Sequence, residues 1–215
     1  MKTNCSVCGS LTTVYRHERF GTFFICETCD YISKDAADYL TDADARALYE
    51  LHENSIHDTR YINYFKDFID KAIIPHASEI KIGLDYGSGP EPVLSHILET
   101  EYGYQMTCYD YFFACNPSYA RKQYALITAT EVVEHIENPL VLFALFKKLL
   151  APRGTLAIMT SFHHKDLERF KNWHYMRDMT HISFFTPRTM RYIATAVGLK
   201  EVYCDCKRYI TFTHL

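Results

Sequence analysis

The chain has 215 residues, of which 48% are hydrophobic and 23% are charged, and its formal net charge at pH 7 is −3. This composition is typical of a globular protein, and the length allows one sizeable core with a small additional unit. The weakly acidic balance gives no electrostatic basis for binding nucleic acid or an anionic membrane. The N-terminal residues lack the apolar core of a signal peptide, and no apolar run reaches the roughly 18 residues of a membrane span. We therefore expect a cytoplasmic protein.

Residues 1–34 form the first predicted unit, in which two Cys-x-x-Cys pairs flank a stretch rich in Tyr, Phe and Thr. That stretch predicts a small β-ribbon. The pairs are Cys5 with Cys8 and Cys26 with Cys29, and together they predict a closed tetrahedral zinc site with a structural role. Iron would use the same four thiolates, so the metal stays open between the two. Redox disulfides are the alternative, but neither pair lies in a thioredoxin-like strand and helix.

Residues 35–78 are predicted to be a helical lead-in, and its last helix ends at Pro75. Its main signal is an apolar stripe at helical spacing, formed by Tyr61, Tyr64, Phe65, Phe68 and Ile69. We interpret this part of the chain as a lid over a ligand, to which His52, Asn54 and Tyr61 contribute. Packing in the core is the alternative role for Tyr61.

Residues 79–215 alternate between predicted strands and predicted helices. Strands are expected at 81–86, 105–109, 124–129 and 155–160, and helices at 92–98, 138–150 and 187–197. Residues 201–206 and 208–213 predict a closing β-hairpin. This alternation predicts an α/β fold with a mostly parallel sheet and helices on both faces.

The turn after the first of these strands reads Leu-Asp-Tyr-Gly-Ser-Gly-Pro-Glu-Pro over residues 84–92. Gly87 and Gly89 let the backbone turn tightly and approach a ligand closely. A dinucleotide enzyme would place a pyrophosphate here, but Asp85 and Glu91 would repel it. The two carboxylates suit a ligand that carries a cationic amine and a sulfonium.

The same turn resembles motif I of class I S-adenosylmethionine methyltransferases, where an apolar pair and an acidic residue precede Gly-x-Gly. Residues 107–111, 125–135 and 149–159 resemble later motifs of that family, in the same order. The C-terminal part is similar to the ubiquinone-type O-methyltransferases. The whole arrangement resembles bacterial methyltransferases that carry a zinc- or rubredoxin-like head.

This resemblance implies a Rossmann-like methyltransferase domain with S-adenosylmethionine as its cofactor. The cofactor-binding residues that it implies are Asp85, Gly87, Gly89, Asp110, Tyr111, Thr130 and Glu131. By this resemblance, Asp110 would bind both ribose hydroxyls of the cofactor. The alternative is that Asp110 is a solvent-exposed aspartate of the turn. Only 13 residues separate Asp110 from Tyr124, too few for the helix and third strand of the family. The edge strand is therefore either missing or a short stub, and Tyr111 and Phe112 would flank the adenine instead.

Ionisable and aromatic residues concentrate between residues 163 and 181, after the strand at 155–160. Open α/β sheets bind ligands beyond the carboxyl ends of their strands, and histidine is the natural base near neutral pH. We therefore expect His181, and after it His174, to be the catalytic base. Trp173, Tyr175 and Phe184 would wall an apolar acceptor. For each histidine, a structural or surface role is the alternative, and their spacing matches no known metal site.

Methyl transfer to a small molecule is the function that these patterns favour. Two alternatives remain: an RNA or protein methyltransferase with the ribbon as reader, and a non-catalytic module that binds the cofactor. The ribbon offers no surface that would follow phosphates, which disfavours nucleic acid as a partner. The sequence identifies neither the methyl acceptor nor the oligomeric state.

Overall fold

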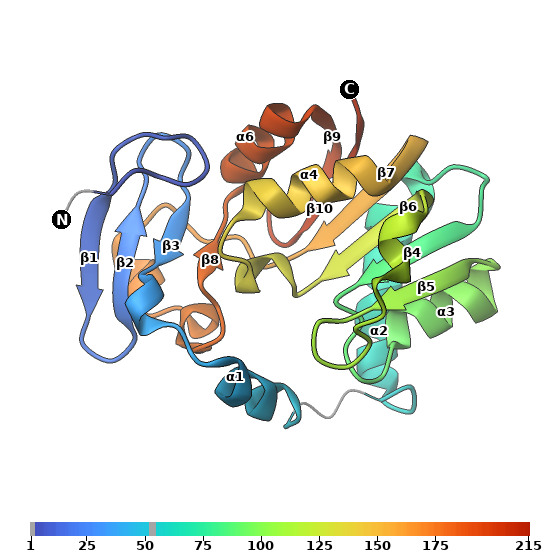
Figure 1. Ribbon diagram of the computed structural model, residues 1–215, viewed down its shortest axis with the longest axis horizontal. Coiled ribbons are helices and arrows are strands. Elements are labelled where there is room, and N and C mark those ends of the chain that lie inside the picture. The colour runs from blue at the N-terminus through green and yellow to red at the C-terminus, as the bar shows by residue number, and fades with distance from the viewer. Residues whose placement is uncertain (1–2, 52–54) are drawn as a thin grey trace.

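The computed structural model describes residues 3–51 and 55–215, so His52 and Asn54 of the expected lid lie outside the described residues. Figure 1 shows two sheets, a small one near the N-terminus and a larger one covered by helices. The predicted α/β fold with a small N-terminal ribbon is confirmed. No helix in the described part of the chain is long and apolar enough to cross a membrane.

The larger sheet has six strands in the order β5-β4-β6-β7-β10-β9. Their bounds are β4 (Ile82–Tyr86), β5 (Gln105–Tyr109), β6 (Tyr124–Thr130), β7 (Leu150–Met159), β9 (Leu199–Cys204) and β10 (Tyr209–His214). The first four pair in parallel, and β10 runs antiparallel to both β7 and β9. Strand β6 is buried along nearly its whole length, as expected for a central strand covered on both faces.

Helices cover both faces of this sheet (Figure 1). Alternate strand residues point to opposite faces, so Leu126 packs with α2 and α3 while Ile127 packs with α4 and α6. The helices are α1 (Asp42–Tyr49), α2 (Thr59–Phe68), α3 (Val93–Tyr102), α4 (Pro139–Leu149), α5 (Leu167–Lys171) and α6 (Pro187–Val197). A π-helical segment, Ile69–Ile73, continues α2. Helix α1 has no buried residue and lies at the edge of the molecule in Figure 1.

The small sheet is antiparallel and has the order β1-β2-β3-β8. Its strands are β1 (Thr13–His17), β2 (Gly21–Ile25), β3 (Ile32–Lys34) and β8 (Ser183–Phe184). Because β8 comes from the C-terminal half, the ribbon is joined to the α/β unit by strand pairing. The Thr189 hydroxyl also donates to the main-chain oxygen of Cys29 (2.8 Å), and His163 Nε2 donates to that of Asp30 (2.7 Å). The boundary expected at residue 34 therefore falls within a continuous packed structure.

No third strand lies between β5 and β6 in the described structure. The intervening residues form a bridge between Asp110 and Ala114 and then a 3₁₀ turn, Pro117–Arg121. Strand β5 is consequently an edge of the sheet. The 13 residues are too few for a helix and a strand, as expected from the sequence.

Candidate active site

A cavity of about 860 Å³ opens beyond the carboxyl ends of β4, β5 and β6. The chain passes from β4 to β5 on one side and then to β6 on the other, which is where open α/β sheets bind their ligands. One wall is the turn after β4, and we call it the glycine wall (residues 85–91 and 110). The opposite side, here called the far wall, consists of residues 39–49, 135–137 and 178–182.

All seven residues predicted to bind the cofactor line this cavity: Asp85, Gly87, Gly89, Asp110, Tyr111, Thr130 and Glu131. Both glycines have positive φ, +79° at Gly87 and +69° at Gly89. A Cβ at Gly87 would overlap the Val132 side chain, whereas a Cβ at Gly89 would meet nothing within 4 Å. Gly87 is thus required by close packing, and Gly89 leaves open space for a ligand.

Asp85 is almost fully buried and is held by two hydroxyl donors. Ser95 donates to one carboxylate oxygen (3.0 Å) and Thr128 donates to the other (2.9 Å). Burial raises the pKa of Asp85 to about 6 despite these bonds. The side chain therefore ties β4 to α3 and β6, in addition to bordering the cavity.

Asp110 is fixed in place by main-chain donors at the end of β5. Its Oδ2 accepts from the amide of Gly89 (2.9 Å), and its Oδ1 accepts from those of Phe112 (2.8 Å) and Phe113 (3.1 Å). These bonds orient the carboxylate beside the glycine turn. Oδ1 thus uses both of its lone pairs, whereas Oδ2 keeps one with which to accept a hydrogen bond from a ligand.

Glu131 follows β6 directly and has a φ of +53°, an unusual conformation for a residue other than glycine. Its carboxylate accepts from the hydroxyls of Tyr64 (2.9 Å) and Tyr175 (2.8 Å). Burial, and after it the charge of Glu134, raises the pKa of Glu131 to about 8. Glu134 is fully buried, which raises its pKa as well, and it accepts a short hydrogen bond from Tyr175. Strained backbone of this kind clusters at functional sites.

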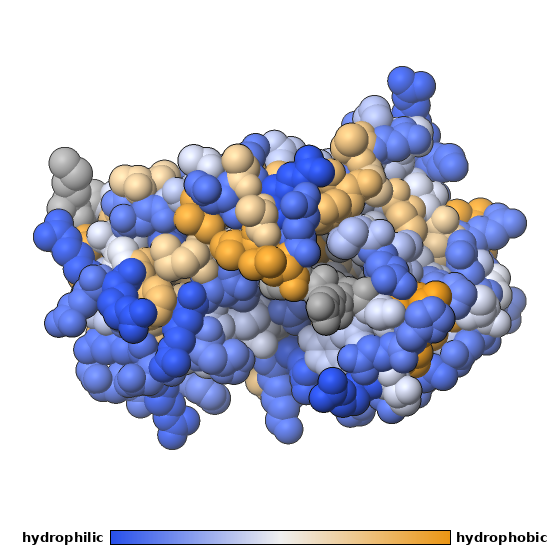
Figure 2. All heavy atoms as spheres, turned by 90° about the horizontal axis from the view of Figure 1, so that it is seen from below, coloured by the Kyte–Doolittle hydropathy of each residue, from blue (hydrophilic) through white to orange (hydrophobic). Residues whose placement is uncertain are grey.

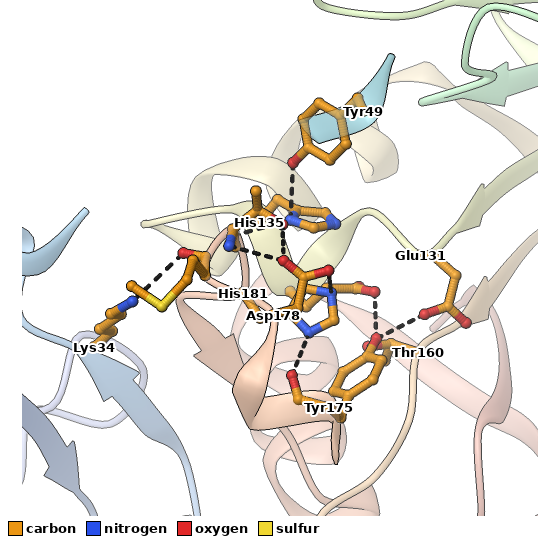
Figure 3. A network of polar contacts seen from close by, with 11 residues as sticks. Lys34, Tyr49, Glu131, His135, Thr160, Tyr175, Asp178 and His181 are labelled. Carbon is orange, nitrogen blue, oxygen red and sulfur yellow. Dashed lines mark hydrogen bonds and ion pairs between the residues drawn. The ribbon is translucent and has the colours of Figure 1, made fainter. Parts of the chain in front are cut away.

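His181 lies on the far wall and is 7% exposed. Its Nδ1 donates to the main-chain oxygen of Tyr175 (2.7 Å), which makes Nε2 the ring nitrogen that can accept a proton. Asp178 Oδ2 lies 3.8 Å from that Nε2 (Figure 3). Burial alone would raise the pKa of Asp178, but His181 and the hydrogen bonds from Thr180 outweigh burial and lower it. The pair therefore combines a candidate base with an ionised carboxylate beside it.

His174 and the expected aromatic wall do not border the cavity. His174 is exposed in the 3₁₀ turn His174–Arg177. Trp173, Tyr175 and Phe184 pack into a hydrophobic cluster together with residues of the ribbon. The Tyr175 ring lies under His181, with 4.1 Å between ring centroids. Of the expected acceptor residues, His181 is thus the one that reaches the cavity.

The far-wall residue Tyr49 gave no signal in the sequence, and it contacts His135 of the motif at 125–135. Tyr49 of α1 lies with its hydroxyl 3.0 Å from His135 Nδ1, and that nitrogen is also 3.0 Å from the main-chain oxygen of Thr180. Burial lowers the pKa of His135, which keeps it neutral near pH 7. The Thr41 side chain caps the start of α1, but nothing local predicts that the helix borders a cavity formed by residues far along the chain.

The four cysteines of the ribbon converge as a metal site requires. The sulfur atoms of Cys5 and Cys29 are 3.6 Å apart, those of Cys8 and Cys26 are 3.4 Å apart, and all four lie within 4.8 Å of one another. A tetrahedral zinc site with Zn–S bonds of about 2.3 Å has sulfur atoms about 3.7 Å apart. The donor set therefore fits zinc.

A second group of three ligand residues lies beside the cavity: Glu134, His135 and His181. One polar atom of each is already engaged in a hydrogen bond. Glu134 accepts from Tyr175, His135 Nδ1 contacts Tyr49 and Thr180, and His181 Nδ1 donates to the main chain. This arrangement favours a hydrogen-bonded network over a second metal site.

A family profile described as methyltransferase domain matches residues 56–203, which is more than half of the chain. The chain therefore belongs to this methyltransferase family. The prediction that it is an S-adenosylmethionine-dependent methyltransferase is confirmed at the level of the family. Among curated proteins, none matches the sequence.

Solved methyltransferase structures share the fold. Mitomycin 7-O-methyltransferase MmcR superposes with a TM-score of 0.55 at 9% identity, over 81% of this chain and 58% of that one. LaPhzM gives 0.54 at 12% identity, over 80% and 59%. CalO1, a methyltransferase in calicheamicin biosynthesis solved in its SAH-bound form, gives 0.51 at 14% identity, over 81% and 59%. This chain spans less than two thirds of the length of each, so the likeness concerns the fold alone.

Proposed function

We propose that this protein transfers a methyl group from S-adenosylmethionine to a small molecule, with His181 as the base. The observation that carries the proposal is the cavity itself, which both the glycine wall and the His181–Asp178 pair line. Of the solved structures with the same fold, one is named as a mitomycin 7-O-methyltransferase and another as a methyltransferase in calicheamicin biosynthesis. These names support a small acceptor.

The residues of the glycine wall fit S-adenosylmethionine. Asp110 is oriented by three amides and has one lone pair left on Oδ2 for a ribose hydroxyl, and the space beside Gly89 admits a ligand. The carboxylates of this wall suit the cationic groups of the cofactor. When bound, S-adenosylmethionine supplies an electrophilic methyl group on a sulfonium. Tyr64 and Glu131 close the cavity at the end of β6.

His181 is placed to remove a proton from the acceptor. Its Nδ1–H bond to the main chain fixes the ring and leaves Nε2 as the basic nitrogen. Asp178 then stabilises the positive charge that the ring gains on protonation. A positioned base of this type contributes about 10²–10⁴-fold to a rate.

The ribbon supports the far wall and does not act as a reader in this proposal. Its strand β3 is covered by β8, and its cysteine knuckles pack into the same core as α4 and α6. The amide of Lys34 donates to the main-chain oxygen of Ile182 (2.8 Å), which lines the cavity. Structural zinc in the four-cysteine site would fix these contacts. These observations disfavour the RNA and protein acceptors.

Calorimetry with S-adenosylmethionine, S-adenosylhomocysteine and NADH tests the proposal. We expect both sulfur ligands to bind at micromolar concentration and NADH to bind at least a hundredfold more weakly, because the glycine wall repels a pyrophosphate. Tight NADH binding, or no binding of either sulfur ligand, would contradict the proposed function.

A further inference from the structure

The side chains that line the cavity give it a net negative charge. No Lys or Arg lines it among the residues that the structure describes, whereas carboxylates occur on both walls. Three of these, Asp85, Glu91 and Asp110, belong to the glycine wall and face the space assigned to the cofactor. Three others, Asp42, Glu137 and Asp178, belong to the far wall. An anionic acceptor would meet repulsion from both sides.

The far wall combines its carboxylates with aromatic rings. Tyr39 and Tyr49 line the cavity beside Asp178 and Glu137, and the ring of Phe112 lies 5.6 Å from that of Tyr49. Aromatic faces attract ammonium groups through their quadrupole, and carboxylates attract them through charge. Figure 2 views the molecule from the side on which α1 lies in Figure 1, and it shows hydrophobic surface in a central band among polar side chains. An aromatic and acidic wall of this kind recognises organic cations.

Lys34 lies close to the far wall, and its charge interacts with that of Asp178. The Nζ of Lys34 donates to the main-chain oxygen of Met179 (3.4 Å; Figure 3), and Lys34 is not among the residues that line the cavity. Deeper in the site, Glu134 is 0% exposed and its Oε2 has no hydrogen-bond partner in the described structure. No ion pair between a cation and Glu131 or Glu134 occurs among the described residues. Because the pKa of Glu131 is raised to about 8, its carboxyl is mostly protonated at pH 7, and the negative charge of the cavity comes from the carboxylates of the two walls.

We propose that the methyl acceptor carries a protonated amino group, which the acidic and aromatic far wall binds. This inference rests on the proposed function, because it concerns the acceptor side of the same cavity. Asp178, Glu137 and Asp42 attract the ammonium group, and Tyr39 and Tyr49 contact its apolar part. The same wall disfavours phosphorylated and carboxylated molecules, because no Lys or Arg lines the cavity among the described residues.

Three phenols that differ in charge and little in shape test the proposal: tyramine, tyrosol and 4-hydroxyphenylacetate. Their affinities are measured by calorimetry on protein saturated with S-adenosylhomocysteine. We expect tyramine to bind at least tenfold more tightly than 4-hydroxyphenylacetate, with neutral tyrosol between them. Equal or tighter binding of the acid, or no binding of tyramine at millimolar concentration, overturns the proposal.

Charge reversal on the far wall supplies the matched comparison. Glu137→Lys should reduce the preference for tyramine over the acid about tenfold, and Glu137→Gln should reduce it less. Glu18→Lys makes the same charge change at an exposed site of the ribbon outside the cavity, and it should leave the preference unchanged. An equal loss in Glu18→Lys would show that overall charge, not the far wall, selects the ligand. Failure of S-adenosylhomocysteine itself to bind would instead refute the proposed function.

Discussion

The two walls of the cavity are built in different ways. The glycine wall comes from one strand, its turn and the end of the neighbouring strand, and its hydrogen bonds join residues that are close in the sequence or in adjacent strands. The far wall brings together α1, the turn after β6 and residues 178–182, which are distant along the chain. The first wall depends on local backbone geometry, and the second depends on long-range packing.

Support for the far wall reaches it from the ribbon. Strand β3 pairs with β8, the Lys34 amide bonds to Ile182, and the Tyr31 hydroxyl lies 2.6 Å from Ser183 Oγ. None of these contacts involves the glycine wall. Changes to the ribbon should therefore disturb the acceptor side while leaving cofactor binding largely intact.

Removal of the ribbon metal should have the largest effect. We expect one zinc per chain, and we expect a strong chelator or Cys26→Ser to unfold the ribbon, because structural zinc contributes about 10–16 kcal/mol to small metal-bound units. Trp173, the sole tryptophan, packs in the cluster that includes ribbon residues, so its fluorescence should change markedly. Affinity for S-adenosylhomocysteine should change less than about threefold. Protein without zinc or iron, with all four thiols titratable, would refute the metal site.

Loss of the proposed base should separate catalysis from binding. His181→Ala should slow methyl transfer by about a hundredfold or more and leave the affinity for S-adenosylhomocysteine nearly unchanged. His174→Ala is the matched control, because His174 is exposed and outside the cavity. The rate is measured as formation of S-adenosylhomocysteine, with tyramine as the methyl acceptor. If His174→Ala slowed methyl transfer and His181→Ala did not, His174 would be the base instead of His181.

On the glycine wall, Asp110→Ala should weaken S-adenosylmethionine binding. Loss of a charge-assisted contact to the ribose costs about 2–3 kcal/mol, or roughly a hundredfold in affinity. Asp70→Ala, which removes an exposed carboxylate outside the cavity, controls for the loss of charge. Unchanged affinity in calorimetry would mean that Asp110 does not hold the cofactor.

The smallest effect concerns Glu131 and the pH dependence of stability. Its pKa rises from 4.5 to about 8 in the folded protein, so folding favours the protonated form. The ligand-free protein should therefore lose stability as pH increases from about 4.5 to 8. Glu131→Gln should be more stable than the wild type at pH 8, with a higher Tm, because the amide stays neutral where the buried carboxyl must ionise. At pH 5 the two should unfold alike, and a stability gain that is the same at both pH values would contradict this account.

Local signals in the sequence predict the glycine wall and most of the α/β unit. The strand expected at 105–109 coincides with β5, and the helix expected at 187–197 coincides with α6. By contrast, β8 has two residues and pairs with β3 from the other end of the chain, so no local pattern could reveal it. Asp178 and Tyr49 reach the cavity through the same long-range packing. His174 is close to His181 in sequence, but the intervening turn directs it to the surface.

A crystal structure with S-adenosylhomocysteine tests the two-walled cavity most directly. We predict that the ribose hydroxyls contact Asp110, that the ligand passes beside Gly87 and Gly89, and that its sulfur faces the space bordered by His181 and Asp178. A ligand bound elsewhere, or a sulfur that faces away from His181, would contradict the account.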